Sequence, residues 1–355
     1  MSSMDNRVPD SPQPERTTPQ HRIPQRTPRR RPSQWRPSHH RTSRRLAARV
    51  ALAVLGATAL VAAFAAPGSA ATAIPARAQS TPYWTNVWLH GHWIKVHTHG
   101  RFGKIPLHRG QGLGLQQGSN LQYNGGPVVH SPAVYLDFWG SQWNSDANGV
   151  EQYMQSFMSG LGQSDDNWST ITSQYTDNSG QGPSFGGSVL AGTWADNSGP
   201  APQSASQSDL AAEAVAAAQH FGVSGDDIQI VVLSPSGTNP DGFPNTGFCA
   251  WHDFTSSGSG NIPYTNMPYV LDAGSSCGAN SVQNQLDGFS IVEGHEYAET
   301  LTDPEPSSGW IDSQGAEIGD KCAWQNLFAI NLSTGSFAMQ PLWSNNDNGC
   351  AQQAP

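Results

Sequence analysis

Positive charge is nearly absent from the larger, C-terminal part of this 355-residue sequence. Thirteen of the 18 Lys and Arg residues lie within the first 77 positions, and only Lys321 follows Arg109. From Gly110 onward, 24 Asp and Glu residues accompany that one lysine, which gives a net charge of 1 − 24 = −23. Such a surface repels nucleic acid and anionic membranes, and both are excluded as partners of this region. A carboxylate buried there has almost no basic residue with which to pair.

Long apolar runs are also missing. The longest, residues 50–66, has 17 uncharged residues, fewer than the ~20 that a membrane-spanning helix needs. It follows 50 residues that include twelve arginines, and small residues in an Ala-x-Ala pattern come after it. These are the three parts of a secretory signal. Residues 1–78 are therefore predicted to be a disordered basic leader plus signal peptide, although an uncleaved anchor stays open.

Export would place the protein outside the cell, with membrane contact only transiently through the signal segment. Ser43-Arg44-Arg45 resembles a twin-arginine export motif, but the bulky residue expected after it is missing. The Sec route and the twin-arginine route both remain consistent with a secreted, extracellular protein.

Cysteine is scarce, and close Cys-x-x-Cys pairs, which a cysteine metal site would need, are absent. The four cysteines all lie in the exported part, where an even number indicates disulfides. Three pairings are possible. We favour the two that close short loops, Cys249–Cys277 and Cys322–Cys350.

The exported part divides by composition into two regions. Residues 79–120 are rich in His and Trp, and their paired histidines alternate at the period of a hairpin. An adhesive strand or a removed prosegment is the favoured interpretation over metal binding. A Gly/Gln/Ser-rich linker, residues 110–118, ends this region. Residues 121–355 form the second region, an acidic domain.

The pattern within the acidic domain mixes strands and helices. Strands are predicted over 133–139 and 228–233, and helices over 150–158, 210–220 and 282–302. The last helix should stop before Pro304, which disfavours helical geometry in the preceding residue. We therefore predict a single α+β (or α/β) domain with a central sheet and long Gly/Ser/Asn-rich loops, stapled by disulfides.

The predicted third helix contains the string His295-Glu296-Tyr297-Ala298-Glu299. His295 and Glu299 lie about 40° apart on one helix face, because 3.6 residues make a turn. Glu296 projects about 100° away, where it could act as a general base. This is the logic of the zinc-peptidase H-E-x-x-H helix, with Glu299 in place of the second histidine. A zincin-like fold with this segment as its active-site helix is the expectation.

Helix phase places His295 and Glu299 in the middle of the apolar arc, with Glu293, Tyr297 and Thr300 on the opposite, polar side. A buried carboxylate costs several kcal/mol unless it is paired, protonated or bound to metal. Because cations are so scarce, a metal ion is the favoured solution. A buried His–Glu pair without an ion and a glycosidase-like carboxylate pair are the alternatives.

Further metal ligands must come from elsewhere. The candidates are Asp303, one helical turn beyond Glu299, and Glu317 and Asp320 in a loop next to Cys322; Asp312 is a further possibility. Zinc is the expected ion, with calcium as an alternative. His252 could line the site, but a packing role is favoured for it.

Several short motifs resemble the EXORDIUM-like (phosphate-induced protein) family of secreted plant and bacterial proteins. They are Leu121-Gln-Tyr-Asn-Gly-Gly-Pro127, Val134-Tyr-Leu-Asp-Phe-Trp-Gly140, Ile230-Val-Val-Leu-Ser234, Gly247-Phe-Cys-Ala-Trp-His252 and Thr302-Asp-Pro304. The resemblance implies an extracellular, wall-associated protein. This sequence keeps His295, Glu296 and Glu299, which several plant members lack, and so favours a metallopeptidase-like bacterial branch.

Two functions are carried forward from the sequence. The first is a secreted zinc-dependent hydrolase, a metallopeptidase acting on extracellular protein or a cell-wall substrate, with Glu296 as the general base. The second is a non-catalytic extracellular protein of the EXORDIUM-like family that associates with the cell wall or binds carbohydrate. Its many tryptophans could form a sugar-binding surface, although packing is the simpler role for each.

Overall fold

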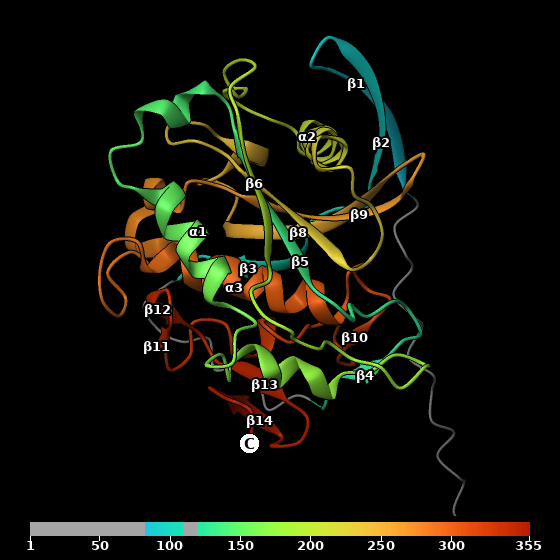
Figure 1. Ribbon diagram of the computed structural model, residues 1–355, viewed down its shortest axis with the longest axis vertical. Coiled ribbons are helices and arrows are strands. Elements are labelled where there is room, and N and C mark those ends of the chain that lie inside the picture. The colour runs from blue at the N-terminus through green and yellow to red at the C-terminus, as the bar shows by residue number, and fades with distance from the viewer. Residues whose placement is uncertain (1–81, 109–118) are drawn as a thin grey trace, which may run out of the picture. The chain divides into compact units, whose positions relative to one another are not determined.

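The computed structural model describes residues 82–108 and 119–355 of the chain (Figure 1). The predicted leader, signal peptide, export motif and linker all lie outside these residues.

A six-stranded mixed sheet forms the centre of the domain. Its spatial order is β3-β8-β9-β7-β5-β6, and β6, β5, β7 and β9 run parallel to one another. β8 is antiparallel to β9, and β3 is antiparallel to β8 and forms that edge of the sheet. The strand bounds are β3 Phe102–Pro106, β5 Ala133–Trp139, β6 Leu190–Asp196, β7 Ile228–Leu233, β8 Phe248–Ser257 and β9 Gly260–Met267. The predicted α+β domain with a central sheet is confirmed.

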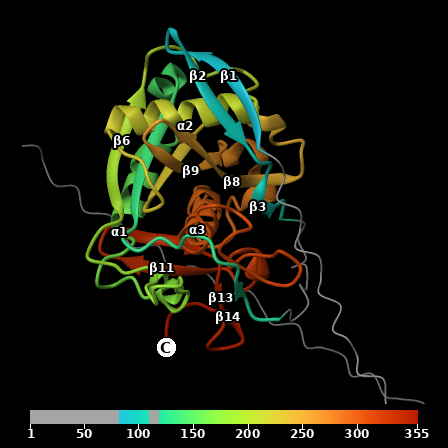
Figure 2. The same cartoon turned by 90° about the vertical axis from the view of Figure 1, so that its right-hand side faces the viewer.

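Three α-helices cover the sheet. α2 (Gln207–Phe221) packs on one face and α3 (Asp287–Thr302) on the other, as Figure 2 shows with the sheet between them. α1 (Val150–Gly160) lies beside α3. α2 begins at a capping box, in which the Ser206 side chain accepts from the Asp209 amide and Asp209 bonds back to the Ser206 amide. The alanine-rich sequence that follows propagates the helix until Gly222, whose left-handed conformation ends it.

α3 differs in two ways from the predicted helix. It begins at Asp287 rather than near Val282, because the Asp287 carboxylate accepts the amides of Val282, Gln283 and Asn284 and holds that segment as a turn. All residues of α3 are buried, because the helix is enclosed by the sheet on one side and by β12 and neighbouring segments on the other.

The prediction that α3 has a polar face is therefore wrong. Glu293, Tyr297 and Thr300 are buried like the apolar residues of the helix. Glu293 accepts a hydrogen bond from Gln229 of β7, at 3.1 Å. The helix phase correctly placed His295 and Glu299 toward the core, but α3 is buried on all sides and has no face exposed to solvent.

The His/Trp-rich region forms the predicted hairpin, β1 (Tyr83–Leu89) paired with β2 (His92–Thr98). The hairpin packs against α2. The sequence analysis set residues 79–120 apart from the acidic domain, yet β3 of this same region is an edge strand of the central sheet. The structural domain thus includes residues 82–108.

Three further two-stranded sheets lie outside the central sheet. The pairs are β4 (Gln122–Tyr123) with β10 (Trp310–Ile311), β11 (Phe328–Leu332) with β12 (Gly335–Met339), and β13 (Leu342–Ser344) with β14 (Gly349–Ala351). Short 3₁₀ segments span Ser141–Ser145, Ser169–Gln174, Pro240–Gly242, Val270–Cys277 and Asp320–Cys322.

Both predicted disulfides are present, Cys249–Cys277 and Cys322–Cys350. Two such bonds indicate an oxidising, extracellular-type environment. No helix in the described residues has the length and apolarity to cross a membrane.

Candidate metal centre

Six ionisable side chains from three parts of the chain meet beneath the edge of the central sheet. We call them the acid–histidine cluster: His252 of β8, His295, Glu296 and Glu299 of α3, and Glu317 and Asp320 of the loop before Cys322. α3 presents its three members to β8, against which it packs. The Cys322–Cys350 disulfide anchors the end of the loop. Asp320 is partly exposed, and the other five side chains are buried.

One group of ligand atoms converges around His295. Its Nε2 lies 3.0 Å from Glu299 Oε1 and 3.9 Å from Asp320 Oδ1. The backbone amide of Asp320 donates to the same Glu299 oxygen at 2.9 Å, which fixes the loop against the helix. One ligand atom from each of these three residues therefore lies within 4.8 Å of the others.

A second group converges around His252 and shares Glu299. His252 Nδ1 lies 3.6 Å from Glu299 Oε2, and its Nε2 lies 3.5 Å from Glu317 Oε1. Nδ1 also pairs with Glu296 Oε2 at 3.2 Å. If Nδ1 of a neutral imidazole donates to Glu296, Nε2 presents a lone pair to the Glu317 carboxylate. Two acceptors then face each other, an arrangement that a proton or a metal ion must resolve.

Six buried polar atoms of the cluster lack a well-formed hydrogen bond: His252 Nε2, His295 Nδ1 and Nε2, Glu296 Oε1, Glu299 Oε2 and Glu317 Oε1. His295 Nε2 and His252 Nε2 instead face carboxylate oxygens at 3.0 and 3.5 Å. Buried polar groups in native proteins almost always have partners. Lys321, the basic residue nearest in sequence, donates instead to Asp312 at 3.0 Å and to the Ser119 carbonyl. Arg101 pairs with Asp241. The salt bridges of the described residues thus bring no Lys or Arg to the cluster.

Burial and mutual repulsion dominate the electrostatics of the cluster. Burial raises the pKa of Glu296, Glu299 and Glu317 well above the usual range, and the nearby charge of Asp320 raises the pKa of Glu299 and Glu317 further. Burial lowers the pKa of His295. The carboxylates cannot all stay ionised without a compensating cation.

Two glycines bring the backbone close to the cluster. A Cβ atom at Gly103 of β3 would collide with Glu299 Oε2 and the His252 ring, and one at Gly319 would lie 2.7 Å from His295 Nδ1. Gly103 has φ +46°, and the β3–β8 register shifts between Phe102 and Ile105. This irregularity lets the main chain of β3 lie directly over Glu299 and His252.

Asp303, another predicted ligand, also contacts the backbone of the loop that follows α3. Its carboxylate accepts the amides of Ser307, Ser308 and Gly309, at 2.7, 3.2 and 2.6 Å, and so organises the loop after α3. Asp312 forms the ion pair with Lys321. The structure gathers Glu317 and Asp320 with His295 and Glu299. Asp303 belongs to neither converging group, but its side chain contacts Glu317 at the border of the cluster.

His252 is the cluster member to which the sequence analysis gave a packing role. It lies on a strand 43 residues before His295, and no local spacing links the two histidines. The available signal was its place in β8, whose neighbours Trp251 and Asp253 are also buried. A histidine in such a buried stretch of strand needs polar partners, and here the partners are the acids of the cluster.

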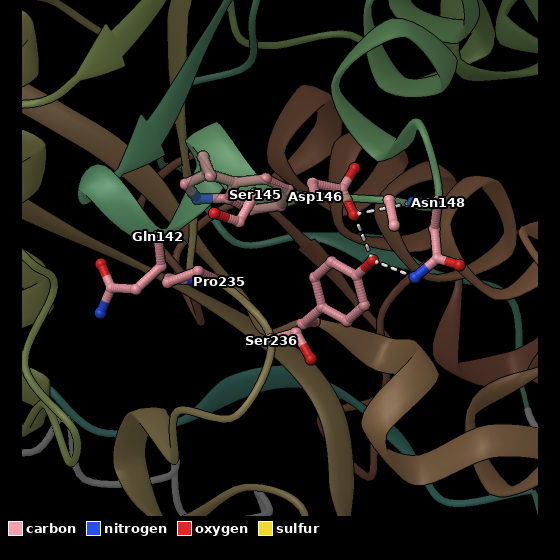
Figure 3. A pocket seen from close by; sticks show the side chains of 9 residues that line it. Gln142, Ser145, Asp146, Asn148, Pro235 and Ser236 are labelled. Carbon is pink, nitrogen blue, oxygen red and sulfur yellow. Dashed lines mark hydrogen bonds between the residues drawn. The ribbon is translucent and has the colours of Figure 1, made fainter.

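A cavity of about 410 Å³ lies elsewhere, at the carboxyl ends of β5, β7 and β9. Figure 3 shows its lining, with Gln142, Ser145, Asp146 and Asn148 on one side and Pro235 and Ser236 on the other. The carboxylate that lines this cavity, that of Asp146, already accepts a hydrogen bond from the Tyr269 hydroxyl at 2.6 Å. Asn148 donates to the same hydroxyl at 2.8 Å. The cavity is separate from the acid–histidine cluster.

The donor set of the cluster fits zinc. Two imidazoles and several carboxylates suit zinc, whereas calcium prefers oxygen ligands alone. Nε2 of His295, which faces Glu299 and Asp320, is the nitrogen that such an ion would engage. Comparison of the chain with protein-family models, with curated proteins and with solved structures finds no significant match to any of them.

Proposed function

We propose that this protein is a secreted zinc-dependent hydrolase, a zincin-like metallopeptidase that acts outside the cell. The observation that carries the proposal is the set of buried, unpartnered nitrogen and oxygen atoms in the acid–histidine cluster, in a part of the chain that has almost no cations. The two disulfides, the acidic surface and the secretory signal in the sequence support an extracellular site of action.

The cluster supplies both ligands and a base. His295, Glu299 and Asp320 would hold the zinc, because their ligand atoms converge. Zinc in such a site polarises a carbonyl group and lowers the pKa of a water molecule toward ~7. Glu296 belongs to neither converging group, and its Oε1 has no partner. This oxygen is free to take a proton from the attacking water, while the other is held by His252.

β3 covers the acid–histidine cluster. Its main chain at Gly103 lies against Glu299 and His252, and the members of the cluster contributed by α3 are fully buried. β3 also pairs with the edge of β8 that faces away from β9. A peptide that replaced β3 would add to β8 as an extended strand and bring a peptide bond over the cluster. Extended peptides are therefore the proposed substrate class, and the chain with β3 in place is closed to them.

Metal analysis of the purified full-length chain tests the proposal. Zinc is expected, and His295→Ala should remove one equivalent, because that substitution deletes a ligand. His108→Ala is the matched control, since His108 stacks on Trp324 and belongs to neither ligand group. Hydrolysis of casein, assayed with and without a chelator, should depend on the metal. Calcium alone, or the same metal content in His295→Ala and the native chain, would contradict the proposal.

A second function is favoured by the hairpin. The tryptophans expected to pack, among them Trp139, Trp143 and Trp168, are buried, whereas Trp84, Trp88 and Trp93 are 48–66% exposed. The rings of Trp88 and Trp93 meet at 5.3 Å on adjacent strands. Exposed aromatic faces of this kind suit a polysaccharide, and they support a cell-wall-binding role like that expected from the EXORDIUM-like resemblance.

Sedimentation with insoluble cell-wall polysaccharide distinguishes this second function. If the hairpin binds sugar, Trp88→Ala with Trp93→Ala should release the chain from the pellet, while His295→Ala should leave it bound. Equal binding by the native chain and the double variant would exclude the hairpin as the binding surface.

A further inference from the structure

A second group of buried acids lies at the other edge of the sheet, where β5 and β6 meet α2. It comprises Asp137 of β5, Asp196 at the end of β6, Glu213 of α2 and His90 from the turn of the β1–β2 hairpin. We call it the β5–β6 cluster. The three acids are 0–2% exposed, although they come from three different elements. The acid–histidine cluster shares no residue with it.

His90 is oriented as a ligand would be. Its Nε2 lies 3.0 Å from Glu213 Oε2 and 3.7 Å from Asp196 Oδ2. Its Nδ1 lies 2.9 Å from the Ser198 hydroxyl. Metal-binding histidines commonly use their second nitrogen in this way, to fix the orientation of the ring. One ligand atom each from His90, Asp196 and Glu213 lies within 4.8 Å of the others.

Asp137 points independently to a bound cation. Its side chain is fully buried, and its neighbour is another acid, Glu213; no donor group bonds to the Asp137 oxygens or to Glu213 Oε1. Burial and the charge of the adjacent Glu213 raise the pKa of Asp137. Burial likewise raises the pKa of Glu213. The salt bridges of the described chain bring His90 alone to these acids, since Arg101 and Lys321 pair with other residues.

We infer that His90, Asp196 and Glu213, with Asp137 beside Glu213, form a second metal site for a divalent transition metal such as zinc. One imidazole with carboxylates favours such an ion over calcium or magnesium. Because His90 lies in the hairpin turn, the ion would join the N-terminal hairpin to α2 and β6. Its role is structural: it holds the N-terminal region, including the hairpin that precedes β3, on the domain.

Zinc binding by the full-length chain tests this inference. After treatment with a chelator, the protein is titrated with ZnCl₂ and its bound metal is counted. His90→Ala and Asp137→Asn should each remove one equivalent or weaken one site by at least ~10-fold, the low end of the loss seen even for supporting residues. His92→Ala is the matched control, because His92 lies on the same hairpin, its ring bonds to the His90 carbonyl, and it belongs to no group of converging ligand atoms. It should keep the full metal content.

The two metal sites are tested separately. His295→Ala should remove the ion of the acid–histidine cluster and leave the ion of the β5–β6 cluster bound. This inference can therefore hold even if the proposed hydrolase function is wrong. His90 is in a surface turn, so His90→Ala keeps the test valid if Asp137→Asn fails to fold. Unchanged zinc content and affinity in His90→Ala would overturn the inference and leave a proton shared by Asp137 and Glu213 as the solution.

Discussion

Replacement of Ile105 by alanine is expected to raise peptide hydrolysis by the full-length chain. Ile105 is fully buried and anchors β3, whose backbone covers Glu299 and His252. Truncation of a buried isoleucine costs about 2–5 kcal/mol, and each 1.4 kcal/mol is a factor of ten in an equilibrium. If the lost stability weakens the pairing of β3 with β8, the form in which β3 is detached should become at least ~10-fold more populated. Turnover should rise by the same factor.

The control and the reversal of this effect both lie within β3. Lys104 is exposed, so Lys104→Ala should leave turnover at the level of the native chain. A synthetic peptide with the sequence of residues 100–107 should compete for the edge of β8 and suppress the gain of Ile105→Ala. An unchanged rate in Ile105→Ala, together with hydrogen-exchange data showing that β3 has opened, would refute the idea that β3 blocks the site.

Local signals predicted those parts of the fold that depend on short-range patterns. The strand over 133–139 and the helix beginning at Val150 follow from apolar periodicity, and both disulfides follow from short loops in an oxidising environment. The start of α3 was missed because the Asp287 side chain captures the amides before it, an interaction that periodicity does not contain. β3 was set apart from the domain because strand pairing across some 140 residues leaves no local trace.

The candidate metal centre was also predictable only where its residues lie close together in the sequence. His295, Glu296 and Glu299 share one helix, and Glu317 and Asp320 were suggested by a loop next to a disulfide cysteine. His252 reaches the cluster because α3 packs on β8, and Gly103 reaches it through the pairing of β3 with β8. Their roles could not be read from spacing.

The β5–β6 cluster was not identified from the sequence, although a usable signal was present. Asp137 interrupts an apolar strand, and Glu213 lies within an alanine-rich helix. The argument applied to Glu299, that a buried acid lacks a basic partner in this domain, applies equally to both residues. What the sequence could not supply was their proximity, which depends on α2 packing across the parallel strands.

The substitution Glu296→Gln is expected to lower peptide hydrolysis by about 10²- to 10⁴-fold, the usual contribution of a general base. Glutamine keeps the size of the side chain but cannot accept the proton. Metal content should not change, because Glu296 lies outside both converging ligand groups. The measurement is best made in the Ile105→Ala background, where turnover is expected to be highest.

Glu293→Gln provides the matched control for this prediction. Glu293 lies three residues earlier on α3, is equally buried, and bonds to Gln229 rather than to the cluster. Its amide variant should therefore keep full turnover. Retained hydrolysis in Glu296→Gln would remove the general-base role, while loss of zinc from that variant would make Glu296 a ligand instead. Only loss of turnover with zinc retained fits a carboxylate that His252 orients and that acts on the attacking water.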